Sequence, residues 1–446
     1  MHIKDTLFWT KNRLLRRPVI EEYKKSLRSN ELSTKAIDKI NLHKRFNLVL
    51  HAKENVEFYR KFYANIALKK KFMNDQGFWD DIPVLEKSHI RAQRKQLLSK
   101  EAKKEDFIKI TTGGSTGEPM VSFRDKRFPE EVLQWRMLER WNVSPAENKL
   151  MLWRTTEESS GRIANIKNKI LWFPTIRIKE DVSLLSNEKM HELFVKSSAA
   201  KVGIVWGYVG AIFSFAEFLL KNDLVYKVSP KCIWVTASPI SSAQREIISI
   251  AFNAPVLDQY ACSEVHWVAS GLPNSQNLIL EQDYRHVDII REDKVVKQMD
   301  HGVYGDLLLT DLHNYAFPLI KYRVGDRGAY ADERWGSKEG FPMLSPVKGR
   351  VSDTLKTRSG KVLSGEYLTT VFDNYSGIIS AFQFIQIDIE NVEIIVVSDS
   401  SQVEGLLKRI TGELEDLVHS ELKFTWLRVE KIEHDRGKTR FIKSLL

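Results

Sequence analysis

The chain has 446 residues, 43% of them hydrophobic; this length exceeds what one hydrophobic core usually organises and predicts at least two folded units. Its two cysteines, Cys232 and Cys262, are too few and too far apart for a disulfide framework or a four-thiolate zinc site. The net charge is +10, and residues 1–100 alone hold 23 Lys and Arg against 11 Asp and Glu. These features exclude the disulfide-rich secreted class and fit a protein of the reducing cytoplasm.

The first hundred residues are expected to be mainly helical, because apolar residues recur at three- and four-residue spacing, as in Phe46, Val49 and Leu50. They are basic but lack the apolar core and cleavage site of a signal peptide. Such a charge excess attracts nucleic acid, anionic lipid or an anionic substrate. Without a nucleic-acid-binding motif, we expect a solvated helical face and no nucleic-acid partner. Peripheral association of residues 7–17 with a membrane surface is the alternative.

Residues 110–119 read Ile-Thr-Thr-Gly-Gly-Ser-Thr-Gly-Glu-Pro. The glycines free the backbone, so N–H groups and hydroxyls can surround phosphate oxygens. This is not a Walker A loop, because no Gly-Lys-Ser/Thr follows the first glycine at the required distance. Taken alone, the pattern also fits a flexible hairpin turn.

Residues 107–347 alternate strand-like with helix-like segments, which predicts an α/β sheet core. The apolar stretch 201–220 contains Lys201, Glu217 and three glycines, so we expect no transmembrane helix. The sequence predicts strands at residues 149–153, 202–205, 232–235 and 305–310, and helices at 212–220 and 242–252.

A second polar cluster, at residues 258–264, follows a strand-like run at residues 254–257. It is therefore expected at the carboxyl end of a strand, where open α/β sheets bind ligands. Tyr260 is suited to stack on a purine, and Glu264 to hold Mg²⁺ against phosphate. Taken alone, this cluster is a generic loop.

A third cluster, at residues 314–328, places Asp326 between two glycines in a predicted turn. Its carboxylate is suited to accept two hydrogen bonds from a ribose diol. Aspartates are common in turns, so this feature gains meaning only in combination with the others.

A fourth cluster, Lys348–Lys356, precedes a change of pattern to a small α+β unit of about a hundred residues. Its predicted elements are strands at 382–389, 392–397 and 422–429 and a helix at 403–418. Near the end, Lys438 stands beside a glycine in the fifth cluster, residues 435–440. A lysine there can act as a mobile electrostatic catalyst, and a basic tail is the alternative.

In their order and spacing, the five clusters resemble the motif series of the adenylate-forming superfamily, the acyl-CoA synthetases and their relatives. More closely, the chain resembles the phenylacetate-CoA ligase and CapK-type branch in its length, its basic helical start and the phrase Asp311–Tyr315 running into Pro318–Ile320. The resemblance covers essentially the whole chain. It implies an α/β fold with a large adenylation core of mixed sheets at 1–349 and a small mobile C-terminal α+β lid domain at 350–446.

The resemblance also implies roles for the matching residues. Ser263 would contact the α-phosphate, Glu264 would bind Mg²⁺, and Lys438 would stabilise the transition state. Asp326 and Arg350 would bind the ribose, and Asp353 would be the hinge of the lid. The loop gripping the β- and γ-phosphates of ATP would comprise Thr111, Thr112, Gly113, Gly114, Ser115, Thr116 and Gly117. The adenine side would comprise Ala237, Ser238, Pro239, Asp258, Gln259 and Tyr260, with Tyr260 stacked on the base.

Tyr208, Ala261 and His266 are expected near the acyl group, although a structural role for His266 is an equal alternative. Ala261 replaces a more usual glycine, and its methyl group narrows that point. Glu118 stands where many relatives carry a lysine or arginine, which removes a positive charge from the phosphate loop. Ala237-Ser238-Pro239 replaces the more frequent Gly-Glu-Pro. Because no cysteines follow Glu264, no zinc is expected.

Together these features predict an ATP-dependent ligase that activates a carboxylic acid as its acyl-adenylate, releases pyrophosphate and passes the acyl group to coenzyme A. An amino group of a sugar in surface-polysaccharide synthesis is the alternative acceptor. A non-catalytic basic binding module on a decayed ligase scaffold is a second alternative. Aromatic residues such as Trp206 and Phe213 favour an aromatic or otherwise flat apolar acid as the substrate. The alternative is that these residues pack in the hydrophobic core. We expect a cytoplasmic monomer or homodimer.

Overall fold

The structure, a computed structural model, divides into two compact units. The first comprises residues 1–8, 146–258 and 348–446, and the second comprises residues 9–145 and 259–347. The chain passes between units within helix α1 (Ile3–Leu15) and strand β7 (Val256–Tyr260). The structure describes residues 3–66, 68, 76–112, 120–153, 170–181, 186–273, 275–335, 340–350, 354–359, 362–364, 368, 372, 378–418, 420–432 and 441–446.

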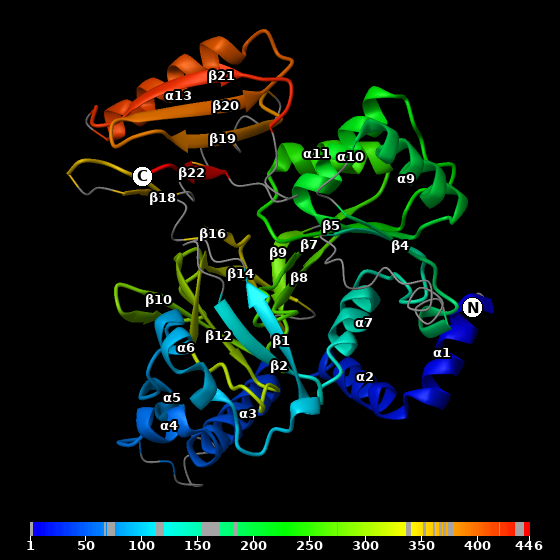
Figure 1. Ribbon diagram of the computed structural model, residues 1–446, viewed down its shortest axis with the longest axis vertical. Coiled ribbons are helices and arrows are strands. Elements are labelled where there is room, and N and C mark those ends of the chain that lie inside the picture. Colours follow the sequence, from blue (N-terminus) through cyan, green and yellow to red (C-terminus); the bar gives the residue numbers. More distant parts are fainter. Residues whose placement is uncertain are drawn as a thin grey trace. The chain divides into compact units, whose positions relative to one another are not determined.

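The first unit contains a parallel sheet, as the alternating pattern predicted. Strand β3 pairs in parallel with β4 and β5, and β5 pairs in parallel with β6. Figure 1 shows α9, α10 and α11 lying together over β5. The elements are β3 (Lys149–Trp153), β4 (Arg177–Asp181), α9 (Asn187–Ala199), β5 (Ile204–Tyr208), α10 (Val209–Lys221), β6 (Cys232–Thr236), α11 (Ser242–Phe252) and β7.

Helix α11 has the bounds predicted from the sequence, because both of its ends are marked locally. The Ser241 hydroxyl accepts a hydrogen bond from Gln244 N, and the Gln244 side chain accepts one from Ser241 N, which forms a capping box. Asn253 ends the helix in the left-handed conformation (φ 47°). Strand β5 lies later than predicted, because Gly203 precedes it and Gly207 and Tyr208 belong to it.

The C-terminal residues form a small α+β domain, and the mixed α/β fold class with a separate small domain is confirmed. Strands β19 and β20 are antiparallel, and β21 and β22 add in parallel on either side. Helix α13 packs on this sheet, as Figure 1 shows in orange. Residue 350 as the domain boundary and the mobility of the domain stay predictions. The elements are β16 (Lys348–Arg350), β17 (Thr354–Lys356), β18 (Val362–Ser364), β19 (Ala381–Gln386), β20 (Asn391–Val397), α13 (Val403–Leu417), β21 (Lys423–Arg428) and β22 (Ile442–Ser444).

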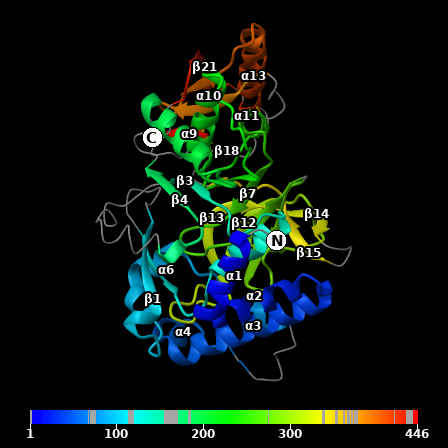
Figure 2. The same cartoon turned by 90° about the vertical axis from the view of Figure 1, so that its right-hand side faces the viewer.

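The second unit begins with the predicted helical region, whose helices α2 to α4 gather at one end of this unit (Figure 2). No helix among the described residues is long and apolar enough to cross a membrane. The helices are α2 (Arg17–Ser29), α3 (Thr34–Asn55), α4 (Glu57–Phe62), α5 (Gly77–Asp80), α6 (Lys87–Gln93) and α7 (Glu131–Arg140), with short 3₁₀ turns at Arg94–Leu97 and Lys104–Asp106.

The strands of the second unit pair mainly antiparallel. Strands β1 and β2 form a hairpin, β10 pairs with β11 and β12, and β12 pairs with β13. Strand β9 pairs with β8 and β15, and β15 with β14. The strands are β1 (Phe107–Thr112), β2 (Met120–Asp125), β8 (Ala269–Leu272), β9 (Ser275–Leu280), β10 (Arg285–Arg291), β11 (Lys294–Val296), β12 (Gly305–Asp311), β13 (Tyr322–Gly328), β14 (Tyr330–Trp335) and β15 (Phe341–Leu344).

Helix α7 is held in the second unit by buried charges as well as by apolar contacts. The Arg136 guanidinium is fully buried and donates to both carboxylate oxygens of Asp283 at 2.8 Å. Arg136 and Arg140 also pair with Glu281. Burial of an ion costs several kcal/mol unless it is paired, so these four residues stabilise the unit only as a complete set.

Candidate active site

The predicted site residues fall in both units, and several lie outside the described residues. Gly113–Pro119, Asp353 and Lys438 are among the latter. Thr111 and Thr112 end β1, directly before the predicted phosphate loop, and Arg350 ends β16. Strand β6 leads into Ala237-Ser238-Pro239, and β5 ends at Tyr208.

In the second unit, the predicted purine-stacking residue lies beside the predicted ribose-binding residue. The Tyr260 hydroxyl donates a hydrogen bond to Asp326 Oδ2 at 3.0 Å. These residues are 66 positions apart in the sequence, at the ends of β7 and β13. One carboxylate and one aromatic ring are therefore brought together as the sequence analysis expected for a nucleoside.

A second pair lies at the same place. Glu264 is only 5% exposed, and its Oε1 accepts a hydrogen bond from the Tyr322 hydroxyl at 3.1 Å. Burial, followed by the nearby Glu264 carboxylate, raises the pKa of Tyr322 far above its ordinary value. Tyr322 therefore remains a protonated donor to Glu264 at any physiological pH.

The site is rich in acceptors. Burial, Glu264 and Asp326 together raise the pKa of the Cys262 thiol well above its ordinary value. The Cys262 sulfur lies 3.3 Å from Val265 N, which donates to it. The cysteine is therefore a protonated thiol that fixes the turn, and the same two carboxylates raise the pKa of Tyr260 after burial.

These residues fit a magnesium ion that is shared with a phosphate, rather than one held by protein alone. Among the described residues, Glu264 has no basic side chain within ion-pair distance, and no group of three His, Cys, Asp or Glu residues is arranged to hold a metal. Mg²⁺ typically binds one or two carboxylates and completes its shell with waters and substrate phosphates. Glu264 is suited to be one such carboxylate.

Asp326 lies in a strand, which corrects the predicted turn. The register of β13 against β12 shifts around Gly325, whose φ is +89°. Such a bulge re-aims the side chain that follows it, and glycine adopts this backbone conformation without strain. The run Asp258–Tyr260 likewise belongs to β7, and the loop after this strand begins only at Ala261.

His266 is held by charged side chains on its own unit. Its Nδ1 contacts the Arg124 guanidinium and lies 3.3 Å from Glu130 Oε2. Arg285 donates to His266 O at 2.8 Å and to Asp311 Oδ1 at 2.7 Å. Burial by itself would raise the pKa of Glu130. His266, Arg124 and Arg285 outweigh this effect and lower the pKa to about 2. These contacts position His266 and favour its structural role.

Two positions in these segments adopt unusual backbone conformations. Ala237 has a φ of +74° and Trp267 a φ of +55°, both in the left-handed region that glycine prefers. Relatives more often carry glycine at the position of Ala237. The left-handed backbone at this position explains that preference, because glycine adopts it without strain. Strained residues of this kind cluster at functional sites.

Sequence reasoning missed Tyr322, Arg124 and Glu130. Tyr322 carried no usable signal, because its partner Glu264 is 58 residues away and the bulge at Gly325 interrupts the alternation of residues 322–326. Arg124 and Glu130 carried no usable signal, because their partner His266 is 142 residues away from Arg124.

Comparison with known proteins gives two matches in sequence. The CapK C-terminal domain family matches residues 355–445. The protein CapK of Staphylococcus aureus is 25% identical over 402 residues, which cover 88% of this chain and 85% of that protein.

Solved structures show the same fold. A 2-hydroxyisobutyryl-CoA ligase in its postadenylation state has a TM-score of 0.70 at 13% identity, covering 91% of this chain and 88% of its own. The O-succinylbenzoate coenzyme A synthetase of Bacillus subtilis, in complex with ATP and magnesium ion, has a TM-score of 0.50 at 12% identity, covering 75% and 68%. The amide bond synthetase McbA of Marinactinospora thermotolerans has a TM-score of 0.50 at 12% identity, covering 76% and 68%.

Proposed function

Because the chain has the fold of the adenylate-forming ligases and carries a CapK-like C-terminal domain, we propose that it is an ATP-dependent enzyme that converts a carboxylic acid into its acyl-adenylate. The observation that carries this proposal is the meeting of the Tyr260–Asp326 and Glu264–Tyr322 pairs. An aromatic ring, a ribose acceptor and a metal-binding carboxylate are the groups that a magnesium nucleotide requires.

In the proposed reaction, a carboxylate oxygen of the acid attacks the α-phosphorus of ATP, and the bond to the bridging oxygen breaks as pyrophosphate leaves. Glu264 would hold Mg²⁺ together with the phosphates, and the ion would supply neutralisation of phosphate charge. Asp326 accepts hydrogen bonds from the ribose hydroxyls and is itself held by the Tyr260 hydroxyl. Positioning and charge neutralisation supply most of the acceleration, because phosphoryl chemistry needs little covalent help from protein.

Further residues, some of them outside the described part, complete the proposal by resemblance. Thr111–Gly117 would surround the β- and γ-phosphates, with Ser263 at the α-phosphate, and Lys438 would stabilise the transition state there. Arg350 would reach the ribose. Rotation about Asp353 would then remove Lys438 and admit the acceptor.

For the acceptor, we propose the thiol of coenzyme A, since the 2-hydroxyisobutyryl ligase and the O-succinylbenzoate synthetase are both named as coenzyme A ligases. An amino group is the second candidate, because the neighbours include an amide bond synthetase. Within that second class, the resemblance to the CapK-type branch implies an amino sugar of surface polysaccharide. Incubation of the adenylate with coenzyme A and with amino sugars, followed by mass analysis of products, separates the two.

For the acid, we propose a flat, aromatic carboxylate of the phenylacetate type. In the first unit, the Tyr208 ring lies 4.7 Å from that of Trp153, and Trp206 stacks on Trp234 at 4.9 Å. Such a group of rings favours a flat apolar partner. Hydroxamate trapping with a panel of aromatic, aliphatic and amino acids tests this preference, and equal rates across the panel would contradict it.

The adenylation step is tested with Lys438→Ala. This variant should lose acid-dependent exchange of pyrophosphate into ATP and keep ATP binding nearly intact, because the lysine acts on the transition state. Lys443→Ala, at an exposed position of β22, is the matched control. Unchanged exchange in Lys438→Ala would remove the lysine from the mechanism.

The metal assignment is tested with Glu264→Gln, which keeps the acceptor oxygen for Tyr322 but removes the charge. We expect exchange to require more Mg²⁺ for half-maximal rate. Glu130→Gln, which changes a half-buried carboxylate in the His266 network, is the control and should leave the Mg²⁺ requirement unchanged. An unshifted Mg²⁺ curve for Glu264→Gln would show that another group binds the ion.

The non-catalytic binding module is the alternative from another class, supported by Glu118 and Ala261. It predicts ATP binding without pyrophosphate release for every acid in the panel. The intact Tyr260, Glu264 and Asp326 cluster favours the enzyme.

We also propose that the protein is cytoplasmic and that α1 allows peripheral contact with anionic membranes. Ile3, Leu7 and Leu14 share one helical face and are 81%, 43% and 78% exposed, with Arg13 and Arg17 exposed nearby. Flotation with phosphatidylglycerol vesicles should recover the protein. Loss of flotation in Leu7→Ser/Leu14→Ser is expected, and recovery that does not change would refute this contact.

A further inference from the structure

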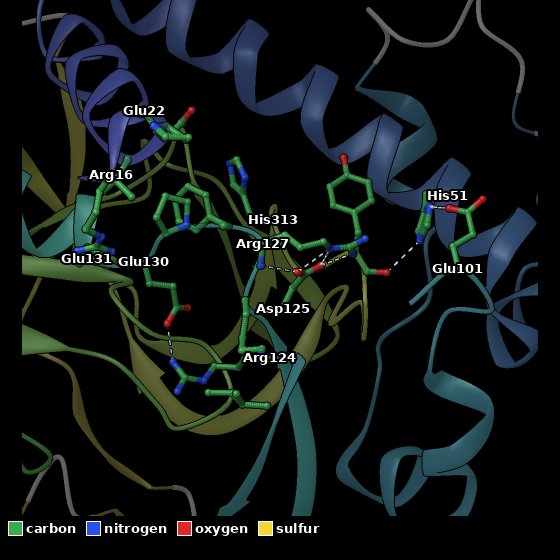
Figure 3. A pocket seen from close by; sticks show the side chains of 17 residues that line it. Arg16, Glu22, His51, Glu101, Arg124, Asp125, Arg127, Glu130, Glu131 and His313 are labelled. Carbon is green, nitrogen blue, oxygen red and sulfur yellow. Dashed lines mark hydrogen bonds and ion pairs between the residues drawn. The ribbon is translucent and has the colours of Figure 1, made fainter. Parts of the chain in front are cut away.

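The second unit contains a pocket of about 890 Å³ that the adenylation proposal does not use (Figure 3). Its volume lies within the range of small-molecule sites, roughly 300–1,000 Å³. None of Tyr260, Glu264, Asp326 and Tyr322 lines it. The walls come from the start of α2, from β2 and the segment that follows it, and from the loop after β12.

Charges in the lining are already paired with one another. Figure 3 shows Arg16 beside Glu131, Arg124 beside Glu130, and Arg127 beside Asp125. Arg127 Nε donates to Asp125 Oδ1 at 2.9 Å. A multiply charged anion such as a phosphate ester would have to break these pairs to gain a cation.

The balance of charge in the lining also disfavours an anion. His313 adds no positive charge, because burial and then the Lys44 ammonium hold its pKa well below the ordinary range. The remaining charged residues are four basic ones (Arg16, Arg124, Lys126 and Arg127) and five acidic ones (Glu22, Glu101, Asp125, Glu130 and Glu131). A neutral or singly cationic ligand therefore fits the pocket better than an anion.

One wall is aromatic. The Phe128 and His313 rings lie 4.3 Å apart at 33°, and Tyr284 packs behind them at 5.1 Å from His313. Pro18 and Pro129 extend the lining. The rings are fixed by one another, so a ligand with a flat C–H face would meet a preformed surface.

The polar part of the lining keeps N–H donors beyond those already paired. A guanidinium carries five N–H groups, and the ion pairs of Arg16 and Arg127 use only some of them. Carboxylate acceptors are also present at the rim, since Glu22 and Glu101 have no bidentate arginine partner among the described residues.

We propose that this pocket binds a carbohydrate, either neutral or bearing an amino group. Sugar rings combine an apolar C–H face with hydroxyls that donate and accept, and the pocket offers an aromatic wall beside closely spaced donors and acceptors. The proposal concerns binding at this pocket and stands apart from adenylate formation. Arg124 lines the pocket and also contacts His266, so an occupied pocket shares a side chain with the segment that carries Glu264.

Binding is tested on the full chain by saturation-transfer NMR with three probes that share one sugar ring and differ in charge. They are glucose (neutral), glucosamine (an ammonium in place of the 2-hydroxyl) and glucose 6-phosphate (an added phosphate). We expect saturable binding of glucose and glucosamine, glucosamine at least as tight, and glucose 6-phosphate about tenfold weaker. Binding should persist with saturating ATP. Displacement by ATP, or tighter binding of glucose 6-phosphate, would overturn the proposal.

Variants of Phe128 test whether the sugars bind at this pocket. Phe128→Ala should weaken both sugars about tenfold, and Phe128→Trp should restore binding because it keeps a flat face. Phe173→Ala, an aromatic residue that is 55% exposed and outside the pocket, is the matched control. An ATP-induced shift in melting temperature that equals that of the unchanged protein confirms folding. Full sugar binding in a folded Phe128→Ala variant, or no saturable binding of any probe, would refute the site.

Discussion

Removal of the Tyr322 hydroxyl tests the geometry of the candidate site most directly. This side chain is fully buried, and its hydroxyl donates to Glu264 Oε1 at 3.1 Å. A hydrogen bond to a charged group contributes about 1.5–3 kcal/mol. Tyr322→Phe should lower the free energy of unfolding of the second unit by that amount, which corresponds to about 3–12 °C at 2–4 °C per kcal/mol.

The charge of Glu264 should account for part of this loss. In a Glu264→Gln background, the same hydroxyl meets a neutral amide oxygen, and the bond contributes only about 0.5–1.5 kcal/mol. The double-mutant cycle should therefore show a coupling energy of about 1 kcal/mol between positions 322 and 264. Differential scanning calorimetry of the four proteins without nucleotide measures it.

Tyr330 supplies the control. Its hydroxyl donates to the neutral carbonyl of Val287 at 2.9 Å, in the same unit. Tyr330→Phe should destabilise the protein by an amount that does not depend on position 264. An equal cost of Tyr322→Phe in both backgrounds would refute the Glu264–Tyr322 hydrogen bond.

Three further substitutions probe other features. Burial, and then Arg177, lower the pKa of Lys149 to about 7, while the unfolded chain keeps this proton up to about pH 10.5. The free energy of unfolding should thus rise between pH 7 and 10.5. Lys149→Met should flatten this rise and add on the order of 1–3 kcal/mol at pH 7, measured by urea titration. An unchanged dependence on pH in this variant would contradict the prediction. Arg136→Met should cost about 3–5 kcal/mol, because Glu281 and Asp283 stay buried without their partner, and a thermal melt with almost no shift would show that the pairing is dispensable. Ala237→Gly should gain about 0.5–1 kcal/mol by relieving the left-handed backbone, and a loss of similar size in a urea titration would refute the strain.

Elements with local signals could be predicted closely from the sequence. Helix α11 has a capping box at Ser241 and a left-handed asparagine at its end, and its predicted bounds match the structure. Strand β3 matches because its buried run is bounded by polar residues. Tyr260 and Asp326, which the resemblance assigns to the nucleoside, lie within hydrogen-bonding distance, and their roles stay predictions.

Features that depend on distant partners could not be predicted. The glycines around Asp326 suggested a turn, but pairing of β13 with β12 makes the segment a bulged strand. The burial of Arg136 left no mark in the sequence, because its partner Asp283 is 147 positions away. Tyr322 became a site residue only because the fold brings Glu264, 58 residues earlier, within 3.1 Å.

The long separation of Arg136 from Asp283 also bears on synthesis of the chain. At roughly 5–20 residues per second, the ribosome makes the partner carboxylates about 7–30 s after Arg136. During that interval α7 exposes two uncompensated arginines and remains hydrated. The second unit can therefore complete its buried ion pairs only after the first-unit residues 146–258 have been made.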